Sequence, residues 1–104
     1  MEFTELEKIE KVVHYLYDAG ALICLEQQPY RYTQLGQALT DWSGRSDAKA
    51  ELGRTRNRLL RMNCIAKKRN GNHYVYTLTP AGRLRLDQIR GIVEAVRDSD
   101  VMDL

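Results

Sequence analysis

The sequence contains few cysteines and prolines, one tryptophan and no long apolar run. Cys24 and Cys64, the two cysteines, are forty positions apart. They do not form a disulfide framework, so we expect two buried free thiols in a reducing compartment. No segment approaches the roughly 20 apolar residues of a membrane helix, and none resembles a signal peptide. We therefore expect a soluble, cytoplasmic (nucleoid-associated) protein with no membrane partner.

Groups of side chains that support catalysis or bind metals are also missing. The two histidines are His14, beside an apolar helix stripe, and His73, near a predicted hairpin tip. No paired carboxylates, nucleophile–base set or Cys/His metal spacing accompanies them. We expect no enzymatic activity, no cofactor, no metal and no small-molecule ligand.

The charge of the chain is unevenly distributed. The formal net charge of the 104 residues is +2, but residues 42–72 hold nine Lys and Arg against two acids, a net of +7. The remaining residues hold seven Lys and Arg against twelve acids, a net of −5. One basic surface on a near-neutral domain is expected of a nucleic-acid-binding protein. The alternative is an arginine-rich helix that is merely solvated.

The centre of the basic stretch has the pattern of an amphipathic helix. Ser46 is placed to cap it and Asp47 to begin it, and the helix is expected to end near Met62. Asn63 then tolerates the left-handed conformation of a C′ position. One side of this helix holds Ala48, Leu52, Thr55, Leu59 and Met62, and the other holds Ala50, Arg54, Asn57 and Arg61.

A β-hairpin is predicted to follow, over residues 64–69 and 72–78. Asn70-Gly71 between them is a strong signal for a two-residue type I′ turn. In that register Ile65 pairs with Tyr76, which gives the hairpin an apolar root. Its tip is basic and carries hydrogen-bonding side chains, namely Lys68, Arg69, Asn70, Asn72 and His73.

Helices are predicted before and after this unit. Residues 4–27 form either one helix or, the preferred interpretation, two segments broken at residues 18–20, because Gly20 costs about 1 kcal/mol in a helix interior. Residues 30–32 are extended and are a candidate third strand of the sheet. Thr33 is expected to cap a helix over residues 34–40, and Trp42 to cover the helix pair from the following turn. Thr79 and Pro80 begin a last helix that frays from Asp98.

Both terminal helices carry an apolar stripe. Each stripe either packs within its own chain or, the preferred interpretation, forms a dimer seam with a second copy. The stripes are Leu6, Ile9, Val13 and Leu16 at the N-terminus and Leu86, Ile89, Val93 and Val96 at the C-terminus.

Three passages resemble the winged helix-turn-helix transcription regulators of the MarR, PadR and HxlR type. They are PYRYTQL at residues 29–35, LLRMNCI at residues 59–65 and YTLTPAG at residues 76–82. The resemblance implies a homodimer that binds a pseudo-palindromic operator with one recognition helix per half-site. Asn63 replaces the glycine that these families usually carry after the recognition helix. Arg56 lies near the apolar stripe, and its side chain is expected to reach an acidic residue. Gly53 is expected to allow the backbone of another segment to approach the helix closely.

The sequence thus predicts an α+β, mostly α, winged helix-turn-helix in a single domain. Residues 1–20 are assigned as a dimerisation arm, 21–79 as the core, 80–97 as a dimerisation helix and 98–104 as a tail. The expected function is sequence-specific binding of double-stranded DNA. The expected contacts from the recognition helix are Arg45, Ser46, Asp47, Lys49, Ala50, Arg54, Asn57 and Arg61; the helix before it adds Thr33 and Gln34, and the hairpin tip adds the five residues above.

Two other functions compete with this one. A winged helix also serves as a protein-interaction or assembly module of a nucleoprotein complex, in which case the basic face meets an acidic protein surface. Binding of double-stranded RNA is a weaker alternative, because its deep, narrow groove does not admit a helix. Only DNA binding predicts a preference for one duplex sequence over a scrambled one at equal salt.

Overall fold

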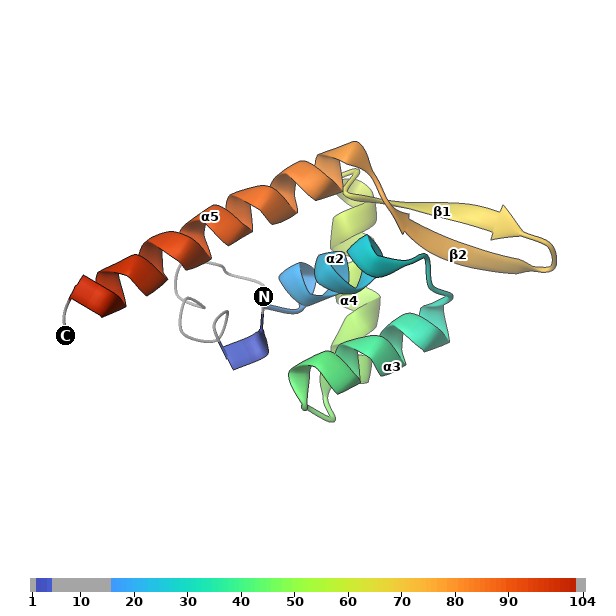
Figure 1. Ribbon diagram of the computed structural model, residues 1–104. Helices are drawn as coiled ribbons and strands as arrows, with labels where there is room; N and C mark the ends of the chain where they lie inside the picture. The colour runs from blue at the N-terminus through green and yellow to red at the C-terminus, as the bar shows by residue number, and fades with distance from the viewer. Residues whose placement is uncertain (1, 5–15, 103–104) are drawn as a thin grey trace.

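The computed structural model describes residues 2–4 and 16–102 and shows an α+β fold that is mostly helical (Figure 1). Its elements are α2 (Leu16–Gln27), α3 (Tyr32–Ser43), α4 (Ala48–Arg61), β1 (Ile65–Asn70), β2 (His73–Leu78) and α5 (Pro80–Met102). Four of the residues considered above, Leu6, Ile9, Val13 and His14, lie outside the described residues. Among the described helices, none combines the length and the apolar character needed to cross a membrane.

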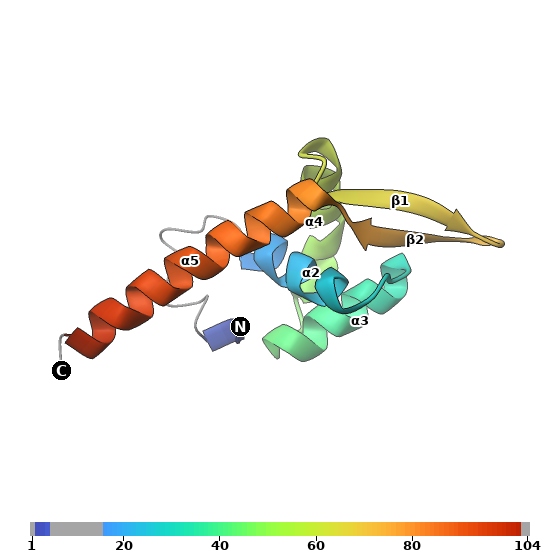
Figure 2. The ribbon, with the colours of Figure 1, turned by 45° about the horizontal axis from the view of Figure 1, so that its top comes forward.

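Helix α2 is the centre of the core. It is apolar nearly all round, and its residues from Leu16 to Leu25 are buried apart from Tyr17. It contacts α3, α4, α5 and β2, and Figure 2 shows it enclosed between α5 on one side and α3 and α4 on the other. A helix with this composition is stable only when the other elements cover it on several sides.

The predicted break at residues 18–20 is wrong, because α2 runs through Gly20 without interruption. A Cβ atom at Gly20 would lie 2.4 Å from Cζ3 of Trp42 and 2.8 Å from Cδ1 of Leu39. Glycine is needed here to let the indole ring approach the helix closely. Trp42 itself belongs to the last turn of α3, not to the turn after it, and its ring meets Phe3 edge-on with centroids 5.4 Å apart.

The starts of α3 and α4 differ from the sequence predictions. Thr33 does not cap α3, which begins at Tyr32 after Arg31, and Oε1 of Gln34 accepts a hydrogen bond from the Arg31 backbone N–H at 3.1 Å. The helix continues to Ser43, and Gly44 after it adopts the left-handed conformation, with φ 69°. Ser46 does not cap α4 either: Asp47 is the residue before the helix, and its carboxylate accepts a hydrogen bond from Tyr17 instead of capping.

The end of α4 confirms the role predicted for Asn63. Its φ is 58°, and it is the one non-glycine residue with a positive φ in the described part of the chain. The Cys64 N–H donates to the Leu59 carbonyl at 2.9 Å and the Asn63 N–H to the Leu60 carbonyl at 3.1 Å, the two bonds of a Schellman motif. Met62 lies beyond the helix and is 42% exposed, so its predicted place in the core is wrong.

The hairpin forms with a different register. Gly71 and Asn72, not Asn70 and Gly71, make the turn, and Ile65 pairs with Leu78 where Tyr76 was predicted. Gly71 takes the first central position with φ 64°, which suits a type II′ turn, while Asn70 stays in the ladder opposite His73. The slip moves each partner by two positions, so the side chains keep their predicted faces. The third strand is reduced to one bridge between Tyr30 and Tyr76.

Helix α5 begins as predicted. Thr79 Oγ1 accepts a hydrogen bond from the Gly82 N–H at 3.0 Å and donates one to the Asn63 carbonyl at 2.6 Å. A Cβ atom at Gly82 would lie 2.0 Å from the Cys64 carbonyl oxygen. Only glycine therefore allows the first turn of α5 to pack this closely against the backbone just before β1. The helical backbone continues to Met102, so the fraying expected from Asp98 is not observed.

The apolar stripe of α5 packs within its own chain. Leu86, Ile89 and Val93 are buried together with Leu16 in the core, and Val96 is half-buried against it. Intramolecular packing is therefore the alternative observed for Leu86, Ile89 and Val93, whereas Val96 is only half-buried, and a dimer seam with a second copy stays a prediction. Arg90, which lies between Ile89 and the buried Val93, forms an ion pair with Glu26 on α2.

Candidate nucleic-acid interface

The exposed face of α4 carries the polar residues that the sequence assigned to it. Ala50, Arg54, Asn57 and Arg61 are exposed, whereas Ala48, Leu52, Thr55 and Leu59 are buried on the opposite side. The Arg54 side chain is 78% exposed, and its Nη1 lies 3.7 Å from Oε2 of Glu51. A surface pair of this length is weak, so Arg54 can turn toward a ligand at little cost.

Three residues near the start of α4 make contacts with other parts of the chain. The guanidinium carbon of Arg45 lies 4.7 Å from the centre of the Phe3 ring, and Tyr17 donates to Oδ1 of Asp47 at 2.8 Å. Burial and this bond to Asp47 raise the pKa of the Tyr17 hydroxyl. Lys49 Nζ donates to Oε1 of Gln37 on α3 at 3.0 Å. Arg45 and Asp47 therefore hold the start of the helix in place, while Ser46 beside them is exposed.

Arg58 belongs to the basic stretch but faces the core. Its Nη2 lies 2.7 Å from Oδ1 of Asp18, its Nε lies 3.1 Å from Oδ2, and the Asp18 side chain is 6% exposed. This bidentate pair joins α4 to α2. The sequence analysis missed it, although an aspartate inside the apolar run of α2 signals a buried cationic partner.

Arg56 and Gly53 have explanations that differ from the expected ones. Arg56 does not reach an acid: its guanidinium carbon lies 4.7 Å from the centre of the Tyr32 ring, and its Nε donates to Oδ1 of Asn57 at 3.3 Å. Gly53 faces a side chain and not a second backbone, because a Cβ atom there would lie 3.4 Å from the Tyr32 hydroxyl. Tyr32 was not singled out in the sequence, and its role depends on the packing of α3 against α4.

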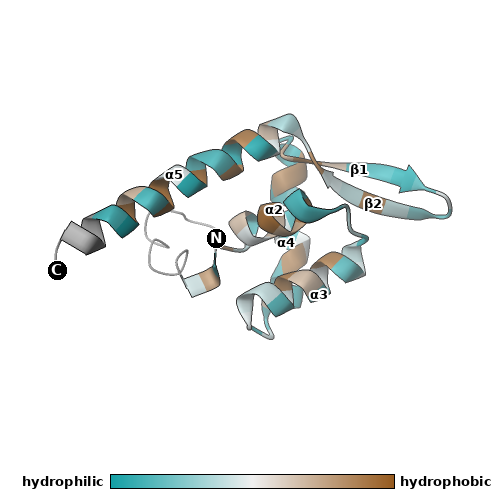
Figure 3. Cartoon of the chain, in the orientation of Figure 1, coloured by the Kyte–Doolittle hydropathy of each residue, from teal (hydrophilic) through white to brown (hydrophobic). Residues whose placement is uncertain are grey.

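The hairpin tip forms a second basic region. Its five predicted residues are all exposed, and Arg69 Nε donates to the Gly71 carbonyl at 3.1 Å. Lys67 Nζ lies 4.5 Å from the centre of the exposed Tyr74 ring. Both ribbon views show the hairpin extending away from the helices, and Figure 3 shows hydrophilic residues along β1. The structure does not bring the tip next to α4, so the two basic regions would contact separate parts of a ligand.

Thr33 and Gln34 lie on the exposed first turn of α3. Gln34 is partly committed, since its side-chain oxygen accepts the Arg31 N–H, while Thr33 is exposed beside it. Arg31 is also exposed at this end of the helix and adds a cation that the sequence analysis did not assign.

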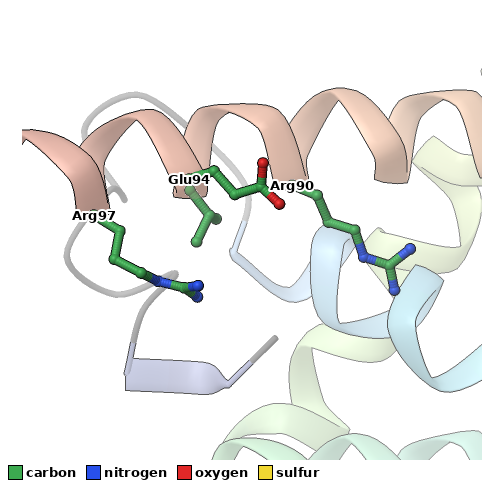
Figure 4. A pocket seen from close by; sticks show the side chains of 4 residues that line it. Arg90, Glu94 and Arg97 are labelled. Carbon is green, nitrogen blue, oxygen red and sulfur yellow. The ribbon is translucent and has the colours of Figure 1, made fainter.

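Open pockets and two buried thiols also occur in the described part of the chain, and one of these pockets lies beside Phe3 and Trp42. A shallow pocket along α5 is lined by Val93 and by Arg90, Glu94 and Arg97, which Figure 4 shows. Arg90 points from it toward α2, where it pairs with Glu26. Burial raises the pKa of the Cys24 thiol to about 11 and also raises that of Cys64. The described residues hold no group of three His, Cys, Asp or Glu suited to a metal.

The chain was compared with known protein families, with curated proteins and with solved structures, and nothing matches it in any of the three. A function therefore has to be argued from the arrangement of the side chains.

Proposed function

We propose that this protein is a winged helix-turn-helix regulator that binds double-stranded DNA in a sequence-specific manner as a homodimer. The order of the elements supports the fold: a first helix, the Tyr30 bridge, α3, α4 and a hairpin. In this interpretation α3 and α4 are the helix-turn-helix pair, α4 is the recognition helix and the hairpin is the wing. The observation that carries the proposal is the exposed Arg54, Asn57 and Arg61 on a helix whose opposite side is fully packed.

Helix α4 has the chemistry of a major-groove reader. Arginine contacts the O6 and N7 atoms of guanine with two hydrogen bonds, and asparagine also contacts base edges. Ala50 lies one turn before Arg54 on the same exposed face, and its small side chain lets this end of the helix approach the bases. Because Leu52 and Leu59 anchor the other side in the core, the face has a fixed orientation.

The hairpin tip supplies the contacts to the DNA backbone. Lys68 and Arg69 are exposed on a strand that extends away from the body, where flexible cations suit phosphates or a minor groove. Such contacts raise affinity for all sequences alike and make it dependent on salt. The two basic regions thus have different tasks, base contacts for α4 and backbone contacts for the tip.

A dimer would use residues of α5 other than the predicted stripe. The helix has 23 residues, about 34 Å at 1.5 Å per residue, and its C-terminal half extends past α2 in both ribbon views. Two copies joined along this C-terminal half would present two α4 helices to the half-sites of a pseudo-palindrome.

The test is a salt titration of binding to a duplex selected from a random pool and to a scrambled control. Arg54→Ala is expected to cost about 1–3 kcal/mol on the selected duplex and to leave the scrambled one nearly unchanged. Lys68→Ala and Arg69→Ala are expected to weaken both duplexes alike and to reduce the salt slope by roughly one unit each. Arg83→Ala, which removes an exposed arginine of α5, is the control matched for charge.

Two outcomes contradict the proposal. If the tip variants lose sequence preference while Arg54→Ala keeps it, the hairpin is the reader and the assignment of α4 is wrong. If the unaltered protein binds the selected and scrambled duplexes equally at every salt concentration, sequence-specific binding is refuted and a protein-interaction or assembly module becomes the better explanation.

A further inference from the structure

Three side chains in contact connect α3 to the exposed face of α4. The Arg56 guanidinium carbon lies 4.7 Å from the centre of the Tyr32 ring, and Arg56 Nε donates to Oδ1 of Asn57 at 3.3 Å. Arg56 is half-buried, whereas Asn57 is exposed on the proposed DNA-binding face. The asparagine is therefore held from behind by a residue that does not itself project from this face.

Gly53 lies beside the tyrosine of this arrangement. A Cβ atom at Gly53 would lie 3.4 Å from the Tyr32 hydroxyl, in ordinary van der Waals contact, so only a side chain longer than that of alanine would press on the tyrosine. The Tyr32 ring supports the flat guanidinium of Arg56, which stacks on aromatic faces more readily than an ammonium group does. This stacking accounts for an arginine near the apolar stripe of α4.

The chemistry of arginine fixes which atom of the asparagine faces it. A guanidinium group carries five N–H donors and no acceptor, so only the carbonyl oxygen of the Asn57 amide can meet Arg56. The amide nitrogen is bonded to the same carbon on the other side of the planar group, and it is directed away from Arg56. A free asparagine can turn either its donor or its acceptor toward a ligand. In this arrangement Arg56 occupies one of the two lone pairs of the Asn57 oxygen and turns that oxygen toward itself, so Asn57 presents mainly its donor.

We propose that Arg56 is a positioning residue that holds Asn57 as a hydrogen-bond donor toward the DNA. This inference rests on the proposed function and specifies the base that Asn57 contacts. A donor suits the acceptors of the major groove, which are N7 and O6 of guanine, O4 of thymine and N7 of adenine. Adenine N7 lies beside the N6 donor, however, and this donor lacks a partner while Arg56 engages the Asn57 oxygen. The two-bond contact of asparagine with adenine needs the same amide to donate to N7 and accept from N6, and Arg56 competes for that acceptor.

Selection of duplexes from a random pool tests the inference for the native protein, Asn57→Ala, Arg56→Met and the control Arg83→Met. The base pair that Asn57 contacts is the one at which the Asn57→Ala variant loses its sequence preference. We expect guanine or thymine there for the native protein, and a relative gain of adenine of roughly two- to tenfold for Arg56→Met, the range of one neutral hydrogen bond. Methionine keeps a contact with the Tyr32 ring while it removes the donor. Arg83→Met removes the same charge from an exposed position of α5, outside the proposed DNA-binding face, and should leave this base pair unchanged.

A measurement without DNA tests the same hydrogen bond. We expect the Arg56 Nε proton to exchange with water faster in Asn57→Ala than in the native protein, and at the native rate in the control Arg83→Met. Equal exchange in all three proteins would overturn the inference, because no bond to Asn57 would then protect the proton.

The outcomes separate this inference from the function on which it rests. A native protein that selects adenine at the Asn57 position, or a preference that stays the same in Arg56→Met, would refute the role of Arg56 and leave sequence-specific binding intact. Loss of all selectivity in the native protein would instead refute the proposed function.

Discussion

Removal of Arg58 is expected to destabilise the protein strongly, although the residue belongs to the arginine-rich helix. Arg58→Met leaves the Asp18 carboxylate, 6% exposed, without the bidentate partner that lies 2.7 Å away. Breaking a buried ion pair from one side costs about 3–5 kcal/mol, because the remaining charge loses both water and its counter-ion. The Arg58 side chain is 26% exposed, which favours the lower end of this range, about 3 kcal/mol. For a domain of this size, that loss lowers Tm by roughly 12 °C or more.

The assay is denaturant unfolding followed by the fluorescence of Trp42, the one tryptophan of the chain, which packs between α2 and Phe3. Asp18→Leu combined with Arg58→Met should recover most of the loss, since a buried pair replaced by apolar groups of similar volume is often neutral. The control is Arg61→Met, an exposed arginine one turn further along α4, with an expected change within about 0.5 kcal/mol. If Arg58→Met costs less than about 1 kcal/mol, water screens the pair and the reasoning from burial is refuted.

Three further predictions concern other parts of the molecule. Gly82→Ala should destabilise by about 1–3 kcal/mol or more, the cost of overpacking, because its Cβ would lie 2.0 Å from the Cys64 carbonyl oxygen. Gly91→Ala, with nothing within 4 Å, should instead stabilise α5 by up to about 1 kcal/mol. Thermal unfolding of both variants tests this difference. The hydrogen bond from Arg90 lowers the pKa of Glu26 below its usual 4.5, so the stability that this pair provides is present above pH 4.5 and is lost as the pH falls through the folded-state pKa. The difference in unfolding free energy between the native protein and Glu26→Gln should therefore shrink in acid. A constant difference down to pH 3 would contradict this prediction. Cys24, with a pKa of about 11 against the usual 9.0, should react with iodoacetamide at pH 8 about a hundredfold more slowly folded than unfolded, and equal rates would contradict its burial.

Local patterns in the sequence were sufficient for several parts of the fold. The spacing of Leu52 and Leu59 placed the buried and exposed sides of α4 correctly, because a regular helix repeats its faces every 3.6 residues. Asn63 at the end of α4 and Thr79 at the start of α5 were also identified, since their bonds connect residues near the ends of the elements. The exposed residues of the proposed interface follow from the same periodicity.

The errors arise where a contact between distant segments decides the structure. Gly20 stays in a helix because Trp42, twenty-two positions later, packs on it. The Asp47 carboxylate accepts a hydrogen bond from Tyr17, thirty positions earlier, and Arg58 pairs with Asp18, forty positions earlier. No local pattern specifies these partners, because each depends on which helices become neighbours in the folded chain.

The junction of α4, β1 and α5 has a consequence for how the hairpin can vary. Thr79 bonds to both Asn63 and Gly82, so the end of α4 and the start of α5 are tied together at the base of the hairpin and not at its tip. Lengthening the hairpin by one residue in each strand would add a rung to the ladder while the junction and the angle between the two helices stay as they are. The reach of the basic tip can therefore change between related chains by pairs of residues, independently of the geometry of α4. Insertion of a single residue, by contrast, would require a bulge, because it would otherwise exchange the two faces of one strand.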